Sequence, residues 1–542
     1  MMRDRRFWLL FGAALLIRLL LLPLPEPIDF DLAYFFFPWM RYSASHSLVE
    51  LYQAGEPLVD YPPLFLLQLV GLSKLYARFV PSLEITPLQY ALIKLPSVAA
   101  DLATGAVIYL AVEGIERRLV GAGSPRPVET DSRRLVGAGS PRPVETDSRR
   151  LVGAGSPRPY ALPLLAAGLW LLNPAVIYVS SIWGQFDSLQ TLGMMAALLA
   201  AARKRWGWSG AFLGLALLTK SQALTIVPLL ALLAWWSGWR ALLRWGGAAA
   251  AVLAAGLLPI WLGGAGESLF TIYVKAVGRY PAMSMNAYNP WFIAHIRSRE
   301  LLGYWVEDST ALLGPLTIRH VGMALTIGYA LLVLFVLFRR WQLARSGDRP
   351  ERAVDGLARS GDRPERAVDG LARSGDRPER AVDGLARSGD RPEQTAGAGL
   401  ARSGDRPERV ADAIWQMGAF FAAGLLIFGF FILATEMHER YILPALAPLA
   451  VAAALLRPAR LPFVLLSATV FLNLIHVLPL TRDQIQLMER LPDIRFALSA
   501  ANTVLLVWWT WLFVRGKRTL ASSGWQPDPQ GTATDGLATL SD

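Results

Sequence analysis

The sequence predicts an all-α, polytopic membrane protein with about twelve transmembrane spans. Of its 542 residues, 54% are hydrophobic and only 18% are charged, and the mean hydropathy is +0.36. Apolar runs recur along the chain, many of them near the ~17 residues that a helix needs to cross a bilayer. A soluble globular class is therefore excluded.

The predicted spans follow the apolar runs from the N-terminus. The first run contains Arg18 and ends among Pro23, Pro25 and Pro27, without a small-residue cleavage site. We interpret it as an uncleaved first span, with a cytoplasmic N-terminus, rather than as a signal peptide. The twelve spans cover residues 7–24, 89–112, 160–180, 187–203, 207–221, 222–238, 242–263, 315–338, 413–434, 441–456, 461–479 and 497–514.

Two segments are tandem repeats that divide the apolar sequence. A 16-residue unit starts at Arg117 and a 14-residue unit starts at Leu343. Both units contain proline and glycine and lack an apolar heptad seam, so a coiled coil is excluded and disordered linkers are expected. The predicted division is membrane modules at 1–116, 160–342 and 412–518, cytoplasmic repeats at 117–159 and 343–411, and a cytoplasmic tail at 519–542.

The basic residues predict which loops face the cytoplasm. If Pro62–Phe79 is an interfacial or re-entrant segment rather than a span, every Lys/Arg cluster falls on one side of the membrane. The net charge of +11 is then a topology signal, and no nucleic-acid partner is expected. The predicted location is the cytoplasmic (inner) membrane, or the endoplasmic reticulum membrane in a eukaryote.

The same topology places a set of polar and aromatic motifs on the external face. Most of them lie in or beside short loops at helix ends, where a pure scaffold would not need them. They are Asp29 and Asp31, Asp60 with Tyr61, Trp183–Ser188, Tyr280–Trp291, and His438–Tyr441.

These motifs, in their order along the chain, resemble those of GT-C glycosyltransferases, and within that class the bacterial membrane proteins related to the second mannosyltransferase of GPI-anchor synthesis. The resemblance rests on the following blocks: Asp31–Trp39, Asp60–Pro63, Lys94–Asp101, Trp183–Ser188, Lys220–Gln222, Asn286–Asn289 and His438–Tyr441. It implies a multispan GT-C-like fold with external interfacial helices, and a sugar donor linked to polyprenyl phosphate.

The acidic pair after the first span is the candidate for acid–base chemistry. Transfer of a sugar from a phosphate-linked donor needs a base for the acceptor hydroxyl, and a single displacement inverts the anomeric carbon. With the resemblance, we expect Asp31 to be that base and Asp29 to be a neighbour with an auxiliary role. The alternative is that these carboxylates only cap a short helix.

The remaining candidates are predicted to bind substrate. Arg440 offers a charge-assisted fork to a phosphate and His438 a further donor, unless Arg440 only snorkels to the interface. Glu439 is expected to pair with Arg440 or to point elsewhere. The other candidates are the cations Lys94 and Lys220, the aromatic and polar group Trp183, Gln185 and Asp187, and the loop residues Asn286, Tyr288 and Asn289, with Asp60 and Tyr61 as auxiliary residues.

No metal and no cofactor are expected. The chain has no cysteine, its five histidines form no spaced ligand pair, and it has no glycine-rich phosphate loop for a nucleotide sugar. The predicted activity is transfer of a hexose, with mannose favoured, from a polyprenyl-phosphate donor to a lipid, glycan or protein acceptor on the external face. The rival interpretations are a transporter or lipid flippase, and a scaffold whose partners bind the arginine-rich loops.

Overall fold

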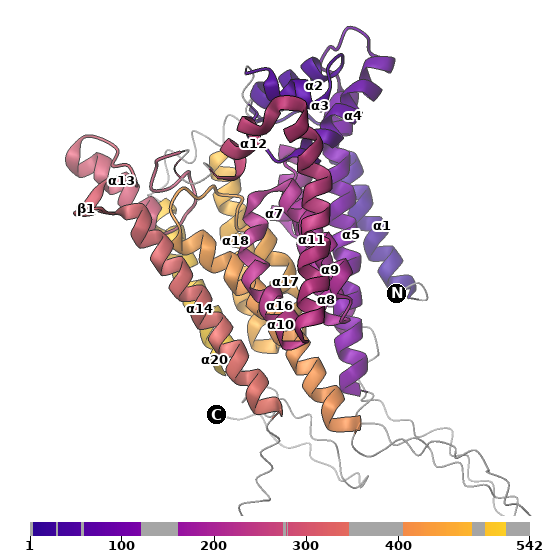
Figure 1. Ribbon diagram of the computed structural model, residues 1–542, viewed down its shortest axis with the longest axis vertical. Helices are drawn as coiled ribbons and strands as arrows, with labels where there is room; N and C mark the ends of the chain where they lie inside the picture. The colour runs from indigo at the N-terminus through magenta and orange to yellow at the C-terminus, as the bar shows by residue number, and fades with distance from the viewer. Residues whose placement is uncertain are drawn as a thin grey trace, which may run out of the picture.

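The structure is a bundle of long helices with a cap of short helices at one end (Figure 1). The computed structural model describes residues 4–28, 31–55, 59–120, 161–274, 278, 280–345, 405–479 and 494–515. The helical fold predicted from the apolar runs is confirmed, because the only strands in these ranges form one short hairpin.

The first part of the chain forms α1 (Arg5–Leu21), the cap helices and α5 (Pro87–Val120). The cap comprises η1 (Leu32–Phe36), α2 (Phe37–Ser43), α3 (Leu48–Gln53) and α4 (Pro63–Phe79).

The central part comprises α6 (Ala161–Leu171), α7 (Pro174–Ile177), η4 (Tyr178–Trp183), α8 (Asp187–Ala202), α9 (Trp206–Thr219), η5 (Ser221–Ile226), α10 (Val227–Trp236), α11 (Trp239–Ile260), η6 (Trp261–Ala265) and α12 (Gly266–Tyr273). The last part comprises α13 (Pro290–Leu302), β1 (Ala311–Leu313), β2 (Leu316–Thr317), α14 (Ile318–Arg345), α16 (Asp405–Leu433), α17 (Leu443–Leu455), η7 (Arg457–Ala459), α18 (Arg460–Val477) and α20 (Ile494–Arg515).

Every predicted span coincides with one of these helices or with a pair of them. Within the described ranges, six helices are long and apolar enough to cross a membrane, and the bent pair over 161–183 would be a seventh. The others are shorter; α9, for example, has 14 residues. A membrane-embedded protein is therefore supported, and the number of twelve spans stays a prediction. The α4 helix, expected to be interfacial, is not among the six.

The helix ends that lead into the repeats lie at the end of the bundle opposite the cap. The C-terminal ends of α5 and α14 and the N-terminal end of α16 all lie there (Figure 1). These helices extend slightly into the repeats, to Val120 and Arg345 and from Asp405. The predicted disorder of the repeats otherwise lies outside the described residues.

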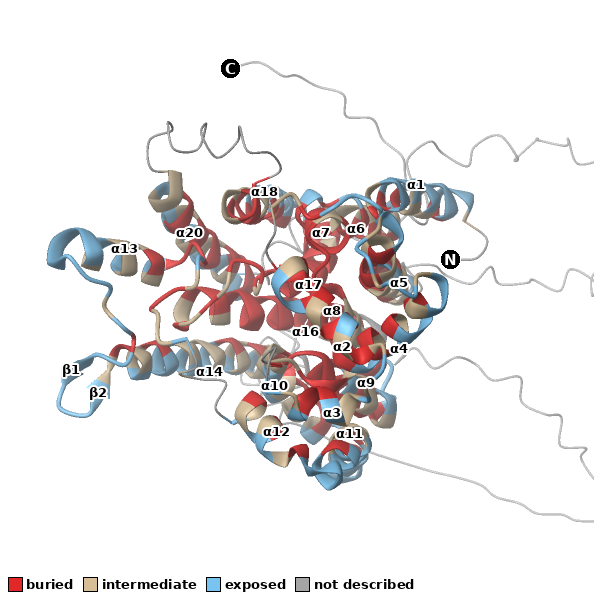
Figure 2. Cartoon of the chain, turned by 90° about the horizontal axis from the view of Figure 1, so that it is seen from above, coloured by how far each residue is buried: buried red, intermediate tan, exposed pale blue. Residues whose placement is uncertain are grey.

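The core lies between α16 and α17. Residues Leu443–Ala454 of α17 are all buried, and 89% of the apolar window of α16 is buried, against 17% for α11 and for α14 (Figure 2). The α11 and α14 helices are thus peripheral and present apolar side chains outward. The α9 helix packs closely on α11, since a Cβ at Gly210 would collide with the backbone carbonyl of Trp245.

A buried ion pair joins the first span to the rest of the bundle. Arg18 Nε on α1 lies 3.0 Å from Asp101 Oδ2 on α5, and both side chains are fully buried. Asp101 Oδ1 also accepts a hydrogen bond from Ser188 on α8. Charges inside a membrane protein are costly unless they are paired, so this pair fixes how the three helices pack.

Candidate functional site

The cap places Asp31 at the start of a helical turn. The backbone N–H groups of Asp31 and Leu32 donate to Oε1 and Oε2 of Glu26, each at 3.1 Å. A carboxylate in this position satisfies N–H groups that have no partner within the helix. Asp31 itself has φ −64° and ψ −40°, which is right-handed helical geometry. Asp29 lies outside the described residues.

The side chain of Asp31 is held by donors from the η4–α8 segment. Its Oδ2 accepts hydrogen bonds from Trp183 Nε1 at 3.0 Å and from Gln185 Nε2 at 2.5 Å. Arg440 Nη1 lies 3.7 Å from the same oxygen. All these contacts are made by Oδ2, and Oδ1 makes no hydrogen bond to the described residues.

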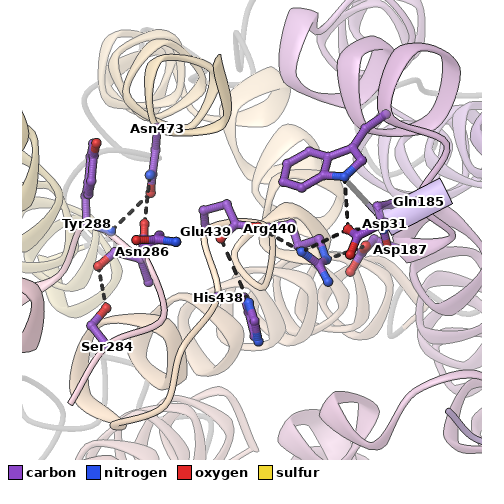
Figure 3. A network of polar contacts seen from close by, with 12 residues as sticks. Asp31, Gln185, Asp187, Ser284, Asn286, Tyr288, His438, Glu439, Arg440 and Asn473 are labelled. Atoms are coloured by element: carbon purple, nitrogen blue, oxygen red, sulfur yellow. Dashed lines mark hydrogen bonds and ion pairs between the residues drawn. The ribbon is translucent and has the colours of Figure 1, made fainter. Parts of the chain in front are cut away.

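Arg440 lies between three carboxylates (Figure 3). Its Nη1 lies 2.9 Å from Glu439 Oε1 and 3.7 Å from Asp31 Oδ2, and its Nε lies 3.9 Å from Asp187 Oδ2. The guanidinium also lies over the Trp183 ring, 5.3 Å from its centroid. The expected pairing of Glu439 with Arg440 is thus present, and Arg440 is too buried for simple snorkelling.

A second buried cation lies beside this group. Lys220 Nζ, between α9 and η5, lies 2.7 Å from Asp187 Oδ1, and both side chains are almost fully buried. The ammonium also lies over the Phe186 ring, 4.9 Å from its centroid. Asp187 therefore connects the two cations of the site, Lys220 and Arg440.

The protonation states of His438 and Glu439 depend on how deeply the loop that contains them is buried. Burial, with the positive charges of Arg440 and Lys220, lowers the pKa of His438 well below its usual value, so the imidazole is neutral near pH 7. The 4.0 Å approach of His438 to Glu439 is then not an ion pair. Burial raises the pKa of Glu439, although Arg440 opposes this shift.

Backbone pairing holds this loop against the loop before α13. Met285 N–H donates to the carbonyl of Met437 at 2.9 Å, and Asn286, at φ +63°, pairs with His438. Asn473 of α18 fixes the same loop, because its side chain donates to the Asn286 carbonyl and accepts from Tyr288 N–H (Figure 3).

A cavity of about 670 Å³ opens at this site. Predicted residues that line it are Asp31, Asp60, Tyr61, Lys220, Asn286, His438 and Arg440. Away from these polar groups the cavity is lined by apolar side chains of α10, α14 and α16, such as Pro228, Ile327 and Phe430. A second cavity of about 520 Å³, also lined by Pro228, continues between α10 and α14 as far as Phe338.

Six predicted binding residues lie outside the cavity lining, namely Lys94, Trp183, Gln185, Asp187, Tyr288 and Asn289. Trp183, Gln185 and Asp187 hold Asp31, Arg440 and Lys220 instead. Lys94 Nζ donates to the Leu24 carbonyl at 2.7 Å, so it supports the chain before Asp31 rather than facing the cavity.

The role expected for Asn289 is corrected. Its side chain is fully buried, its Oδ1 caps α13 by accepting from Phe292 N–H, and its Nδ2 donates to the Phe431 carbonyl. Both polar atoms of the side chain therefore have partners within the fold. The Oδ1 contact is the one expected of an asparagine at a helix N-cap.

Two charged features of the site, at Glu26 and at Arg319, are not predicted from the sequence. Glu26 accepts hydrogen bonds from the backbone of the turn at Asp31. Its position between Pro25 and Pro27, directly after the first span, is the only local feature of the sequence that could have indicated this role. Arg319 was also missed. It bridges Asp308 at 2.7 Å and Glu436 at 3.0 Å at the cavity wall, and no local pattern connects these three positions.

Within the described ranges, no group of three or more His, Asp or Glu side chains is arranged to hold a metal ion. A comparison with protein-family models and with curated proteins found no match.

Proposed function

We propose that this protein is a membrane glycosyltransferase that transfers a hexose from a polyprenyl-phosphate donor to a lipid, glycan or protein acceptor on the extracytoplasmic face. The ordered motifs favour a GT-C type of enzyme and mannose as the sugar. Asp31 acts as the general base, and the reaction inverts the anomeric carbon.

The observation that carries the proposal is the shape of the cavity. One end is polar and lined by Asp31, Lys220, His438 and Arg440, and the other continues into an apolar groove between α10 and α14. Lining residues on α14 run from Arg319 to Phe338, a rise of about 28 Å, close to the ~30 Å of a bilayer core. A ligand with a charged head and a long apolar tail fits this combination.

The polar end provides groups for both reacting partners. Arg440 has further N–H donors besides the one used by Glu439, and its Nε makes no hydrogen bond within the described residues. With Lys220 it supplies two positive charges for a phosphodiester. The Oδ1 atom of Asp31, which has no hydrogen-bond partner among the described residues, would accept the proton of an acceptor hydroxyl.

Blocking the groove tests the proposal. Ala330 of α14 lines the cavity, whereas Ala324 is exposed on the same helix and does not. Ala330→Trp should weaken binding of a synthetic polyprenyl-phosphate hexose to the purified protein at least tenfold, and Ala324→Trp should leave it unchanged. Transfer of radiolabelled hexose into membrane lipid or glycan is the matching activity assay. Equal affinities of the two variants for the donor would refute the groove as its site.

One observation favours the second candidate, a lipid flippase. The groove continues past the midplane towards Phe338, near the stacked rings of Trp236 and Trp341. A transporter site is expected near the midplane, whereas the charged groups here lie at the external end. Movement of labelled polyprenyl phosphate between leaflets of proteoliposomes, without sugar transfer, would favour this candidate.

A further inference from the structure

An arm projects sideways from the external end of α14 (Figure 2). It consists of the end of α13, the following loop and the β1–β2 hairpin, over Leu301–Thr317. In Figure 1 it lies beside the top of α14 and outside the bundle. No described part of the chain covers its tip, and the lateral position keeps the arm near the level where α14 leaves the bilayer.

The tip of the arm is apolar. Leu313 pairs with Leu316, and the register shift between Ala311 and Leu313 leaves Leu312 in a bulge beside them. Leu312 is 58% exposed and Leu313 is 78% exposed. Further large exposed side chains of the arm are Leu301, Leu302, Tyr304 and Trp305.

The base of the arm is fixed, so its direction is set by the fold. Asp308 is fully buried and accepts hydrogen bonds from Arg319 Nε and Nη2 and from the Thr435 hydroxyl. Backbone bonds from Ile318 to Thr310 and from Arg319 to Asp308 join the hairpin to the first turn of α14.

We propose that this arm inserts into the outer leaflet of the membrane. Leu312, Leu313 and Leu316 at the tip are all exposed large apolar side chains, and an apolar medium would cover all three at once. The arm also continues the exposed apolar surface of α14, which includes Leu325 and Leu332. Tyr304 and Trp305 are residue types enriched at the membrane interface.

Insertion would hold the outer end of α14, one wall of the apolar groove, at the membrane surface. Thr317 is followed directly by Ile318, the first residue of the apolar span. Interfacial apolar elements typically reach about 5–10 Å into the headgroup and acyl boundary. The proposal does not depend on what reaction the site performs.

The chain has no cysteine, so single spin labels test the insertion directly. The full-length protein is labelled at Leu312→Cys or Leu313→Cys and reconstituted into liposomes, and collisions with oxygen and with a water-soluble nickel chelate are measured. Leu325→Cys on the outer surface of α14 is the lipid reference, and Ser45→Cys, exposed in the cap, is the water reference.

We expect the labels at both positions of the tip to collide with oxygen as at Leu325, and several-fold less with the nickel chelate than at Ser45. Access of the chelate to either label equal to that at Ser45 would overturn the proposal. Shielding of both labels from both reagents would also overturn it, because a protein neighbour or a second copy of the chain would then cover the tip. Unchanged thermal unfolding of the labelled variants is the check on folding.

Discussion

At the scale of single residues, the motifs identified most of the polar groups of the site but not their partners. Asp31, Lys220, His438 and Arg440 were expected at a common face, and all four line the cavity. The sequence did not indicate that Asp187 connects Lys220 with Arg440. Such contacts join positions far apart in the chain, and side-chain types alone do not determine which cation pairs with which carboxylate.

The proposed base is tested by Asp31→Asn, which preserves size and hydrogen bonding but removes the basic carboxylate. We expect turnover to fall by ~10²–10⁴ while donor affinity changes little. Transfer of radiolabelled hexose and a donor titration measure the two effects separately. Asp412→Asn, at an exposed carboxylate on the far side of the bundle, is the matched control. Full turnover in Asp31→Asn, with loss in Asp60→Asn, would place the base at Asp60.

Arg440 requires two substitutions because it is buried among carboxylates. Arg440→Ala leaves Asp31, Asp187 and Glu439 without the guanidinium, and we expect it to destabilise the fold by ~3–5 kcal/mol. Arg440→Lys keeps the positive charge but loses the planar set of N–H donors of the guanidinium. It should fold and bind donor more weakly by ~1.5–3 kcal/mol. Thermal unfolding and donor titration distinguish the two effects, and wild-type donor affinity in Arg440→Lys would contradict the assigned role.

At the scale of elements, the apolar runs located the helices well, whereas the shape of the cap was not predictable. Every predicted span has a helix in place, because the need to satisfy backbone hydrogen bonds in an apolar medium leaves few alternatives. The π-helical turns η1 and η4 and the pairing of His438 with Asn286 carry no periodic signal. They depend on tertiary contacts, such as those of Glu26 and Asn473.

The loop after α16 should make stability depend on pH. Burial, with the hydrogen bond and negative charge of Asp308, raises the pKa of Glu436 to about 7, although Arg319 and the Gly278 N–H oppose this shift. A carboxyl whose pKa is higher in the folded state stabilises the fold at low pH, and this contribution is lost as the pH rises through about 7.

Glu436→Gln resembles the protonated form, so it should match the wild type at pH 5 and have the higher unfolding midpoint at pH 8. Thermal unfolding of both proteins across this range is the measurement. Glu307→Gln, at an exposed position in the loop before β1, is the control and should keep the pH dependence of the wild type. An identical pH dependence in Glu436→Gln and the wild type would show that Glu436 does not titrate in this window.

At the scale of the whole molecule, the charge distribution predicts one polarity for the bundle. The cap lies at one end of the bundle, and the helix ends that lead into the repeats lie at the other (Figure 1). Asp31, Asp60 and Tyr61, from the cap and its loops, line the polar end of the cavity. Lys204, between α8 and α9, is expected on the cytoplasmic side, and Ser45, in the cap, on the external side.

Single cysteines test this polarity. A membrane-impermeant thiol reagent should label Ser45→Cys in intact cells, and Lys204→Cys only after the membrane is permeabilised. The unmodified chain, which has no cysteine, is the blank. Labelling of Lys204→Cys in intact cells would reverse the assigned sides and remove the argument for an external site.

The repeats are expected to be dispensable, because the helix ends that lead into them lie at the end of the bundle opposite the cap. Residues 123–157 and 348–402 can be replaced by short Gly/Ser linkers without shortening α5, α14 or α16. Changing the length of a loop costs only about 0.6 kcal/mol per doubling, so unfolding and hexose transfer should both stay close to wild type. A variant with the same repeat residues in scrambled order is the control for composition. Loss of transfer in a well-folded deletion variant, with retention in the scrambled one, would show that the length or charge of these segments is needed. Loss of transfer in both the deletion and the scrambled variant would mean that a partner recognises the sequence of the repeats, as expected for a scaffold.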